Sequence, residues 1–341
     1  MKIDILCGSG SPDGIIGSDI YGNSDRVGLG GAELALFTLC KAWMDAGHEV
    51  MIYNNPRRED GVFNQRRREQ FDKHEKRDVL IIWREPNQKI VDANGLKVWF
   101  STDQYTTGDY KHFAQFPDKI VTISPFHSEY FKSVYGIENS IPIDLPIRIW
   151  EYEGYEKTEK IPNRLIFTSV PDRGLELVAK TLPRIREAIP DVSLVVTSDY
   201  RLWGTQSPMN SQFMTMFLRE PNVQFLGAID RRRLVEEQLK AQILYFPCTY
   251  QELFCIACAE AMVAGCVPIA TSEGALATTN MGVLVDGGAK NPATQQAFVD
   301  KAIEYLQRKD LTKIQEGLRE KATKRFAPEA IVKQWNERVF A

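Results

Sequence analysis

The sequence has 341 residues, of which 43% are hydrophobic and 26% charged, so neither a disordered chain nor a coiled coil is expected. This length suits two domains of about 150 residues each and predicts a cleft between them. The 42 Lys and Arg residues against 45 Asp and Glu residues give a net charge of -3, which argues against nucleic acid as the main partner and favours small molecules.

The N-terminus predicts a chain without a signal peptide. Asp4 interrupts an apolar run that is too short for one, so we expect the mature chain to start at Met1. No stretch approaches the roughly 18 apolar residues of a membrane-spanning helix. Six cysteines fit reduced thiols. We expect a cytoplasmic protein with at most peripheral membrane contact.

Short β-branched or aromatic runs alternate with helical stretches along the whole chain, which predicts βαβ units and parallel sheets. The expected strands are 2–7, 49–53, 79–83, 97–101, 119–123 and 140–143, then 164–168, 193–197, 223–226, 242–246, 267–271 and 282–285. Two doubly wound sheets fit this pattern better than one sheet of twelve strands. We therefore predict an α/β fold with two Rossmann-like domains, 1–150 and 163–325.

A glycine-rich turn precedes the first predicted helix, residues 34–46. It contains Gly28, Gly30 and Gly31, and the helix behind it would direct free N–H groups and a positive dipole end toward an anion. This arrangement suits a phosphate, although a tight turn that leads into a helix explains it equally well.

Residues 57–77 contain eight Lys or Arg against five acids. They form either a solvated surface helix or loop, or a basic patch that attracts an anionic acceptor or a lipid surface.

Residues 148–162 have no clear apolar period and are predicted to link the domains. After Pro292 the chain is predicted to be helical, and the last helix, 326–341, to pack back on the N-terminal domain.

The most informative segment, residues 243–270, has the pattern of buried strand, loop, helix, glycine stop and buried strand. Glu252 falls at the carboxyl end of the strand, where ligands of open α/β sheets bind. Glu252 could accept hydrogen bonds from sugar hydroxyls, and Glu260, about two turns along the helix, from a ribose diol. The first-turn N–H groups of Phe254, Cys255 and Ile256 would remain for a diphosphate or sugar. Alternatively, Glu252 caps the helix and Glu260 lies on its solvated face.

Four cysteines fall within this part of the chain: Cys248, Cys255, Cys258 and Cys266. Cys255 and Cys258 form a CxxC, which could belong to a zinc or redox site. The surrounding apolar strand and helix favour the interpretation that these cysteines pack as small hydrophobic residues. We expect no metal site.

The Glu-x7-Glu spacing of Glu252 and Glu260, followed by Ala-Met-Val-Ala-Gly-Cys-Val-Pro-Ile-Ala, resembles the donor site of retaining family-four (group 1) glycosyltransferases of GT-B fold. The turn at Gly30 and Gly31 resembles the first-domain loop that faces the donor diphosphate. The segment 169–176 resembles the loop that opens the second domain, where a basic residue before a glycine binds the diphosphate.

The resemblance implies roles for individual residues. Glu252 would bind donor-sugar hydroxyls, Glu260 the ribose and Arg173 the diphosphate, while the backbone of Leu226 and Gly227 would edge the base pocket. Domain 1–150 would be on the acceptor side, and 163–325 would bind the nucleotide sugar.

The chain also departs from the family pattern. Arg173 stands where many members have lysine, and a second basic residue is missing upstream. Where many members have a histidine near the reacting sugar, this chain has Thr102-Asp103-Gln104. Asp103 either orients a hydroxyl of acceptor or donor or is an ordinary loop acid.

The resemblance implies a metal-independent hexosyl transfer with retention, from GDP-mannose ahead of UDP-sugars, to a hydroxyl of a glycan, lipid or protein-linked glycan. The departing diphosphate would help to deprotonate the acceptor, so Arg173, Glu252 and Asp103 are the candidate catalytic residues, with no strong base among them. The alternatives are a catalytically weak nucleotide-sugar-binding protein and another GT-B enzyme, such as an epimerase or phosphorylase.

Overall fold

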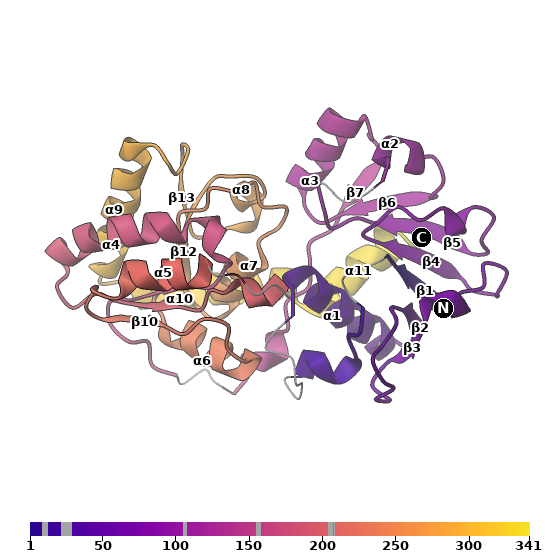
Figure 1. The fold of residues 1–341 in the computed structure, drawn as a ribbon, viewed down its shortest axis with the longest axis horizontal. Helices are drawn as coiled ribbons and strands as arrows, with labels where there is room; N and C mark the ends of the chain where they lie inside the picture. The colour runs from indigo at the N-terminus through magenta and orange to yellow at the C-terminus, as the bar shows by residue number, and fades with distance from the viewer. Residues whose placement is uncertain (9–12, 22–28, 105–107, 155–157, 204–206, 208) are drawn as a thin grey trace. The chain divides into compact units, whose positions relative to one another are not determined.

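The computed structural model describes residues 1–8, 13–21, 29–104, 108–154, 158–203, 207 and 209–341. The chain divides into two compact units (Figure 1). Unit 1 comprises residues 1–26, 31–146 and 326–341, and unit 2 comprises residues 27–30 and 147–325. Each unit contains one parallel sheet with helices packed on it, which confirms the predicted fold class.

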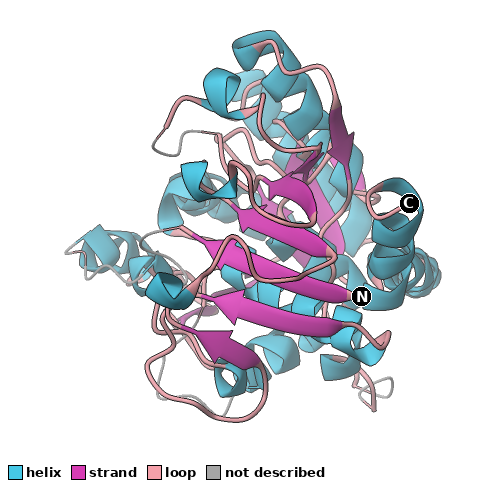
Figure 2. Ribbon diagram, turned by 90° about the vertical axis from the view of Figure 1, so that its right-hand side faces the viewer, coloured by secondary structure: helices cyan, strands magenta, loops and turns pink. Residues whose placement is uncertain are grey.

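The sheet of unit 1 has the strand order β3-β2-β1-β4-β5-β6-β7, and Figure 2 shows these strands side by side. All neighbouring strands pair in parallel. The central strand β4 is apolar and buried along its whole length, as expected for a sheet that is covered on both faces. The strands are β1 (Lys2–Cys7), β2 (Glu49–Tyr53), β3 (Asn64–Arg66), β4 (Val79–Trp83), β5 (Leu96–Phe100), β6 (Lys119–Thr122) and β7 (Ser140–Pro142).

The helices of unit 1 are α1 (Gly31–Asp45), α2 (Tyr110–Phe113), α3 (Pro125–Tyr130), the π-helical turn Phe131–Tyr135 and α11 (Pro328–Arg338). α1 buries Leu36, Leu39 and Trp43, which recur at helical spacing. α11 packs against α1, where Trp335 meets Trp43 edge to face with ring centroids 5.1 Å apart. The last helix of the chain thus completes the core of unit 1.

The sheet of unit 2 has the strand order β10-β9-β8-β11-β12-β13, again all parallel. Ile243 of β11 lies beside Leu165 of β8 on one side and Val267 of β12 on the other. The strands are β8 (Arg164–Phe167), β9 (Ser193–Val196), β10 (Val223–Phe225), β11 (Ile243–Phe246), β12 (Val267–Thr271) and β13 (Val283–Val285).

The α-helices of unit 2 are α4 (Leu175–Ala188), α5 (Met209–Phe217), α6 (Arg231–Lys240), α7 (Ile256–Val263), α8 (Leu276–Thr279), α9 (Pro292–Leu306) and α10 (Leu311–Phe326). Short 3-10 turns occur in both units, at Gly17–Tyr21, Arg68–Gln70, Gln88–Ile90, Ile149–Glu151, Pro171–Arg173 and Tyr200–Trp203. Within the described part of the chain, no helix has the length and apolar character needed to cross a membrane.

The structure contains all twelve predicted strands and one that the sequence prediction missed. β3 lies within residues 57–77, which we expected to form a surface helix or loop. Residues 148–162, predicted to link the domains, fall within unit 2, and their described part, 148–154 and 158–162, packs on the rest of that unit. The Tyr152 hydroxyl donates to Oε1 of Gln238 at 2.7 Å, and Nζ of Lys160 donates to the carbonyl of Ala264 at 2.8 Å.

Candidate functional site

The carboxyl ends of β8 and β11 carry two of the predicted catalytic residues. These strands are neighbours at the centre of the unit 2 sheet, where the strand order reverses direction. Ligands of open parallel sheets bind outside the carboxyl ends of the strands at such a position. The segment after β8 contains Arg173, and the segment after β11 contains Glu252.

Gly174 allows these two segments to approach each other closely. Its φ is 115°, in the region that favours glycine, and a Cβ built on it would lie 2.2 Å from the carbonyl oxygen of Pro247. A side chain at this position would collide with the backbone that follows β11. The glycine thereby lets the neighbouring Arg173 reach Glu252.

Arg173 is held by three neighbours. Its Nε donates to Oε1 of Glu252 at 3.1 Å, and its Nη1 lies 3.4 Å from Oδ2 of Asp172. Its guanidinium carbon lies 3.6 Å from the ring centroid of Tyr250, in a cation–π arrangement. The side chains of Arg173 and Glu252 keep 14% and 17% of their surface exposed, so the pair remains open to a ligand.

The surroundings of Glu252 differ from those of an ordinary helix-start acid. Burial raises the pKa of its carboxyl, and the Arg173 guanidinium opposes that shift. Glu252 does not cap the next helix, because the N-cap is Cys255 and no side chain caps it. Its carbonyl accepts from the Ala275 amide at 2.7 Å, which fixes its backbone against the segment after β12. Glu176, which lies in the first turn of α4, pairs with Lys180 and not with Arg173.

α7 begins directly after this loop. Cys255 has φ 70° and ψ 78°, a left-handed conformation that is uncommon for a residue other than glycine. The first-turn amides of an α-helix lack the usual acceptor four residues earlier, and the side chain of the N-cap residue Cys255 does not cap them. Phe254, Cys255 and Ile256 therefore lie at a helix start whose backbone suits an anion.

Glu260 lies on α7 and is 6% exposed, so it does not occupy a solvated helix face. One carboxylate oxygen lies 2.6 Å from Nη2 of Arg231, and the other accepts from Gln238 at 3.4 Å. Arg231 also pairs with Glu151 at 2.7 Å. This buried ion pair holds the Glu260 carboxylate in place. Burial acts to lower the pKa of Arg231, but Glu260 and the other acidic neighbours outweigh it and raise that pKa.

Sequence reasoning missed Arg231. It is the first residue of α6, directly after the helix cap Asp230. The segment between β10 and α6 also contains Leu226 and Gly227, of which Gly227 has φ 67° and Leu226 donates its amide to the Val196 carbonyl at 2.8 Å. The sequence does place Arg231 four residues after Gly227, in a segment predicted to contact the nucleotide, and this position could have identified it as a site residue.

In unit 1, a network of charged side chains surrounds Asp103 at the carboxyl ends of β4 and β5. The Arg84 guanidinium hydrogen-bonds to Asp103 and donates to Oε1 of Glu33 at 2.7 Å. Glu33 belongs to the first turn of α1, which begins at Gly31 directly after Gly30. Gly28 lies outside the described residues.

Arg84 itself has φ 69°, a left-handed conformation that arginine rarely adopts. The indole Nε1 of Trp99 donates to its carbonyl at 3.1 Å and helps to hold that backbone. The two carboxylates around the guanidinium raise the pKa of Arg84 despite its burial. Sequence reasoning had not identified Arg84 as the partner of Asp103.

His127 approaches the same loop from α3. It is fully buried, and its Nε2 lies 3.3 Å from the Asp103 carbonyl oxygen. Burial lowers the pKa of His127 to about 3, so the imidazole is neutral at physiological pH. Thr102, the residue before Asp103, is 6% exposed, and its hydroxyl has no hydrogen-bond partner among the described residues.

The basic segment 57–77 is largely neutralised by acids of unit 1. Four of its arginines form ion pairs: Arg57 with Asp19, Arg66 with Glu75, Arg68 with Asp13 and Arg77 with Asp4. The Arg77–Asp4 pair is fully buried, with a separation of 2.7 Å. These pairs reduce the charge that the segment can offer to an anionic ligand.

The four clustered cysteines are buried as free thiols. Burial raises the pKa of each, which keeps them protonated. Among the residues that the structure describes, no group of three or more His, Cys, Asp or Glu side chains is arranged to hold a metal ion.

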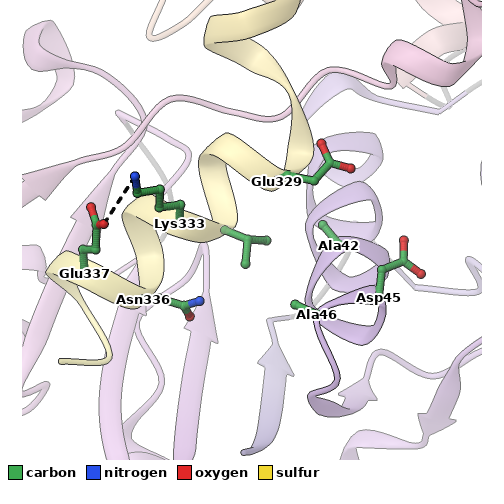
Figure 3. A pocket seen from close by; sticks show the side chains of 8 residues that line it. Ala42, Asp45, Ala46, Glu329, Lys333, Asn336 and Glu337 are labelled. Atoms are coloured by element: carbon green, nitrogen blue, oxygen red, sulfur yellow. Dashed lines mark ion pairs between the residues drawn. The ribbon is translucent and has the colours of Figure 1, made fainter.

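A cavity of about 480 Å³ lies between α1 and α11 of unit 1 (Figure 3). Its charged lining is predominantly acidic: Asp45, Glu329 and Glu337, with Lys333 paired to Glu337. Asp45 is the last residue of α1, whereas the glycine turn precedes the first, about 20 Å away along a 15-residue helix. The cavity is therefore separate from the predicted anion site and poorly suited to phosphate.

Residues 163–325 match the family of glycosyl transferases group 1. The match covers the segment that contains Arg173, Glu252 and Glu260. No curated protein matches the sequence.

Several solved structures have the same fold over nearly the whole chain. AviGT4, a glycosyltransferase involved in avilamycin A biosynthesis, is 18% identical, with a TM-score of 0.68 over 98% of this chain and 96% of that one. A glycosyltransferase from Rickettsia africae ESF-5 is 12% identical, with a TM-score of 0.71 over 99% and 97%. Anabaena Alr3699/HepE, solved in complex with UDP and glucose, is 16% identical, with a TM-score of 0.67 over 99% and 98%. These likenesses identify the fold as GT-B.

Proposed function

We propose that this chain, a glycosyltransferase of GT-B fold with a glycosyl transferases group 1 domain at residues 163–325, is a retaining hexosyltransferase. Its donor is a nucleotide-diphosphate sugar, with GDP-mannose ahead of UDP-sugars. Its acceptor is a hydroxyl group of a glycan, a lipid or a protein-linked glycan.

The observation that carries this proposal is the position of Arg173 beside Glu252 and the start of α7. Arg173 is fixed by Glu252, Asp172 and Tyr250 but is still partly exposed. A diphosphate bound there would meet a guanidinium and the uncapped first turn of α7. Both are preorganised, so they can stabilise negative charge as it grows on the leaving phosphate.

The remaining donor contacts follow the same sheet edge. We assign Glu252 to hydroxyls of the transferred sugar, and Glu260 to the ribose, because Arg231 fixes the orientation of its carboxylate. The backbone at Leu226 and Gly227 edges the base pocket. The amides of Phe254, Cys255 and Ile256 face the diphosphate or the sugar.

We also assign Gly30 and Gly31 to the donor diphosphate, and Asp103 of unit 1 to a reacting hydroxyl. Hydrogen bonds from Arg84 fix the orientation of the Asp103 side chain. A side chain held in this way suits a role in orienting a hydroxyl group.

The proposed reaction takes place on one face of the sugar. The acceptor oxygen forms a bond to the anomeric carbon as the bond from that carbon to the phosphate oxygen breaks. The acceptor proton passes to the departing diphosphate, so no strong protein base is needed. We propose that positioning and positive charge from Arg173 replace a metal ion in this step.

Nucleotides and nucleotide sugars test the proposal directly. GDP, UDP and their hexose derivatives should be compared by thermal unfolding, where a ligand at 100 times its Kd adds about 2.7 kcal/mol of stability. The preferred donor is then incubated with candidate acceptors, and the anomeric configuration of the product is read by NMR. Absence of binding by every nucleotide sugar contradicts the donor assignment, an inverted product contradicts retention, and loss of transfer in EDTA contradicts metal independence.

A further inference from the structure

The segments after β9 and β10 bring Asp199 and Arg201 against Gly227 within unit 2. A Cβ built on Gly227 would lie 3.4 Å from Oδ2 of Asp199 and 3.5 Å from Nη2 of Arg201, which is ordinary contact distance. The Ala228 amide, next in the chain, donates to Oδ2 of Asp199 at 3.3 Å. Arg201 therefore stands beside the backbone that we assign to the edge of the base pocket.

Asp199 fixes the orientation of the Arg201 side chain. The aspartate is 4% exposed, and its Oδ2 accepts from Nε and lies 2.6 Å from both Nε and Nη2 of Arg201. Its Oδ1 accepts from the Arg201 amide at 2.8 Å and from Nδ2 of Asn210 at 2.6 Å. Burial alone would raise the pKa of Asp199, but these hydrogen bonds lower it, so the carboxylate stays charged.

The outer end of the guanidinium stays available for a ligand. An arginine fork has five N–H donors, and the edge formed by Nε and Nη2 is used by Asp199. The edge formed by Nη1 and Nη2 points away from that carboxylate. Among the described residues, which omit 204–206 and 208, no acid or carbonyl pairs with Nη1, and the Arg201 side chain is 46% exposed. Such an edge can donate two parallel hydrogen bonds to two neighbouring acceptors.

We propose that Arg201 reads the base of the donor nucleotide and selects guanine over uracil. Guanine carries two adjacent acceptors, N7 and O6, which match a bidentate arginine. Uracil offers one carbonyl acceptor on the corresponding edge, so it can accept one of the two hydrogen bonds from the guanidinium. A matched bidentate pair discriminates between bases by about 5- to 150-fold in affinity. This inference rests on the proposed function and narrows its donor to the class of GDP-sugars.

The test is a comparison of GDP and UDP affinity by calorimetry in four proteins. The unsubstituted protein should bind GDP about 5- to 150-fold more tightly than UDP. Arg201→Ala should lose that preference through weaker GDP binding alone. Arg201→Lys should also lose most of it, because it keeps the charge but not the fork. Arg232→Ala, which removes an 82% exposed arginine from α6, is the matched control and should bind both nucleotides normally.

The possible outcomes separate this inference from the function on which it rests. Equal weakening of GDP and UDP in a folded Arg201→Ala protein would show a general charge effect and overturn the base assignment. Tighter binding of UDP than GDP by the unsubstituted protein overturns it as well. If neither nucleotide binds, the proposed function itself fails, and this inference fails with it. Thermal unfolding of each variant verifies that its fold is intact.

Discussion

Arg173 should matter more for turnover than for donor affinity. Charge on the leaving phosphate grows as the glycosidic bond breaks, so a fixed cation favours the transition state over the bound donor. We expect Arg173→Ala to lower kcat by roughly a hundredfold or more. Arg173→Lys should restore part of the activity, because it keeps the charge but loses the fork and the contact with Tyr250.

The measurement is kcat with a matched donor and acceptor. Lys180→Ala, at an exposed ion pair of α4, is a suitable control and should be close to normal. A folded Arg173→Ala protein with near-normal turnover would reduce the role of Arg173 to its ion pairs with Asp172 and Glu252.

The two glutamates of the Glu-x7-Glu motif should separate nucleotide affinity from sugar affinity. Glu260→Gln should weaken binding of free nucleotide by about 1.5 to 3 kcal/mol, because a charged hydrogen-bond acceptor for the ribose is lost. Glu252→Gln should leave free-nucleotide affinity intact and weaken binding of the nucleotide sugar. Calorimetry with both ligands measures each effect, and Glu236→Gln on α6 serves as the control. Equal losses for both ligands in Glu252→Gln would contradict its assignment to the sugar.

His127 should make the stability of the protein depend on pH. Its pKa is lowered to about 3 in the folded state from 6.5, because burial disfavours the imidazolium. Between pH 3 and pH 6.5 the unfolded chain binds one more proton, at His127, than the folded chain does. The buried imidazole therefore does not change the free energy of unfolding above pH 6.5, and it lowers that free energy as the pH falls below 6.5. We expect a loss of about 1.4 kcal/mol per pH unit below 6.5.

Urea unfolding at pH 7 and pH 5.5, in the unsubstituted protein and in His127→Asn, isolates this effect. The variant should lose about 1.4 kcal/mol less than the unsubstituted protein between these pH values. Identical pH dependence in the two proteins would show that His127 titrates normally in the folded state.

For individual site residues, the sequence predicted their positions on strands, loops and helices better than the side chains with which they pair. The spacing of Glu252 and Glu260 placed one carboxylate after a strand and the other along a helix, as the structure has them. It did not predict that Arg231 holds Glu260 or that Arg84 holds Asp103. Those contacts depend on how helices and loops pack, which a local pattern does not encode.

Among the elements, the segments after β8 and β11 depend on Gly174. Gly174→Ala should cost about 1 to 2 kcal/mol for the left-handed backbone, and its Cβ would also collide with the Pro247 carbonyl. The collision should move Arg173 away from Glu252 and lower turnover. Gly47→Ala is the control, because Gly47 also has a positive φ but its Cβ would meet nothing within 4 Å. Urea unfolding should show a larger loss of stability in Gly174→Ala than in Gly47→Ala, because only the former adds a collision to the backbone strain. The value of kcat should fall in Gly174→Ala alone.

The elements themselves were predicted from alternating apolar runs, and the reason for the one omission is visible in the structure. β3 consists of Asn64, Gln65 and Arg66, and none of them is buried. An edge strand of three polar residues has no hydrophobic periodicity for a sequence pattern to detect. β4 is the opposite case, because its five buried apolar residues specify a central strand by themselves.

At the scale of the whole molecule, α11 should be essential to the stability of unit 1. Trp335 is 1% exposed, and its ring centroid lies 5.1 Å from that of Trp43 and 5.2 Å from that of Phe100. Trp335→Ala should lower the free energy of unfolding by about 3 to 5 kcal/mol. Urea unfolding measures this, with Lys333→Ala at a 74% exposed side chain as the control. A loss below 1 kcal/mol would mean that unit 1 is stable without this contact.

The contribution of α11 to unit 1 has a consequence for the order in which the protein folds during synthesis. Residues 147–325 of unit 2 are translated between the first part of unit 1 and α11. At about 5 to 20 residues per second, the ribosome spends on the order of 10 s or more on that interval. Throughout it, Trp43 and Phe100 lack Trp335, their partner in the core of unit 1. Synthesis of unit 2 is therefore complete before that of unit 1, although the first residues to be made belong to unit 1.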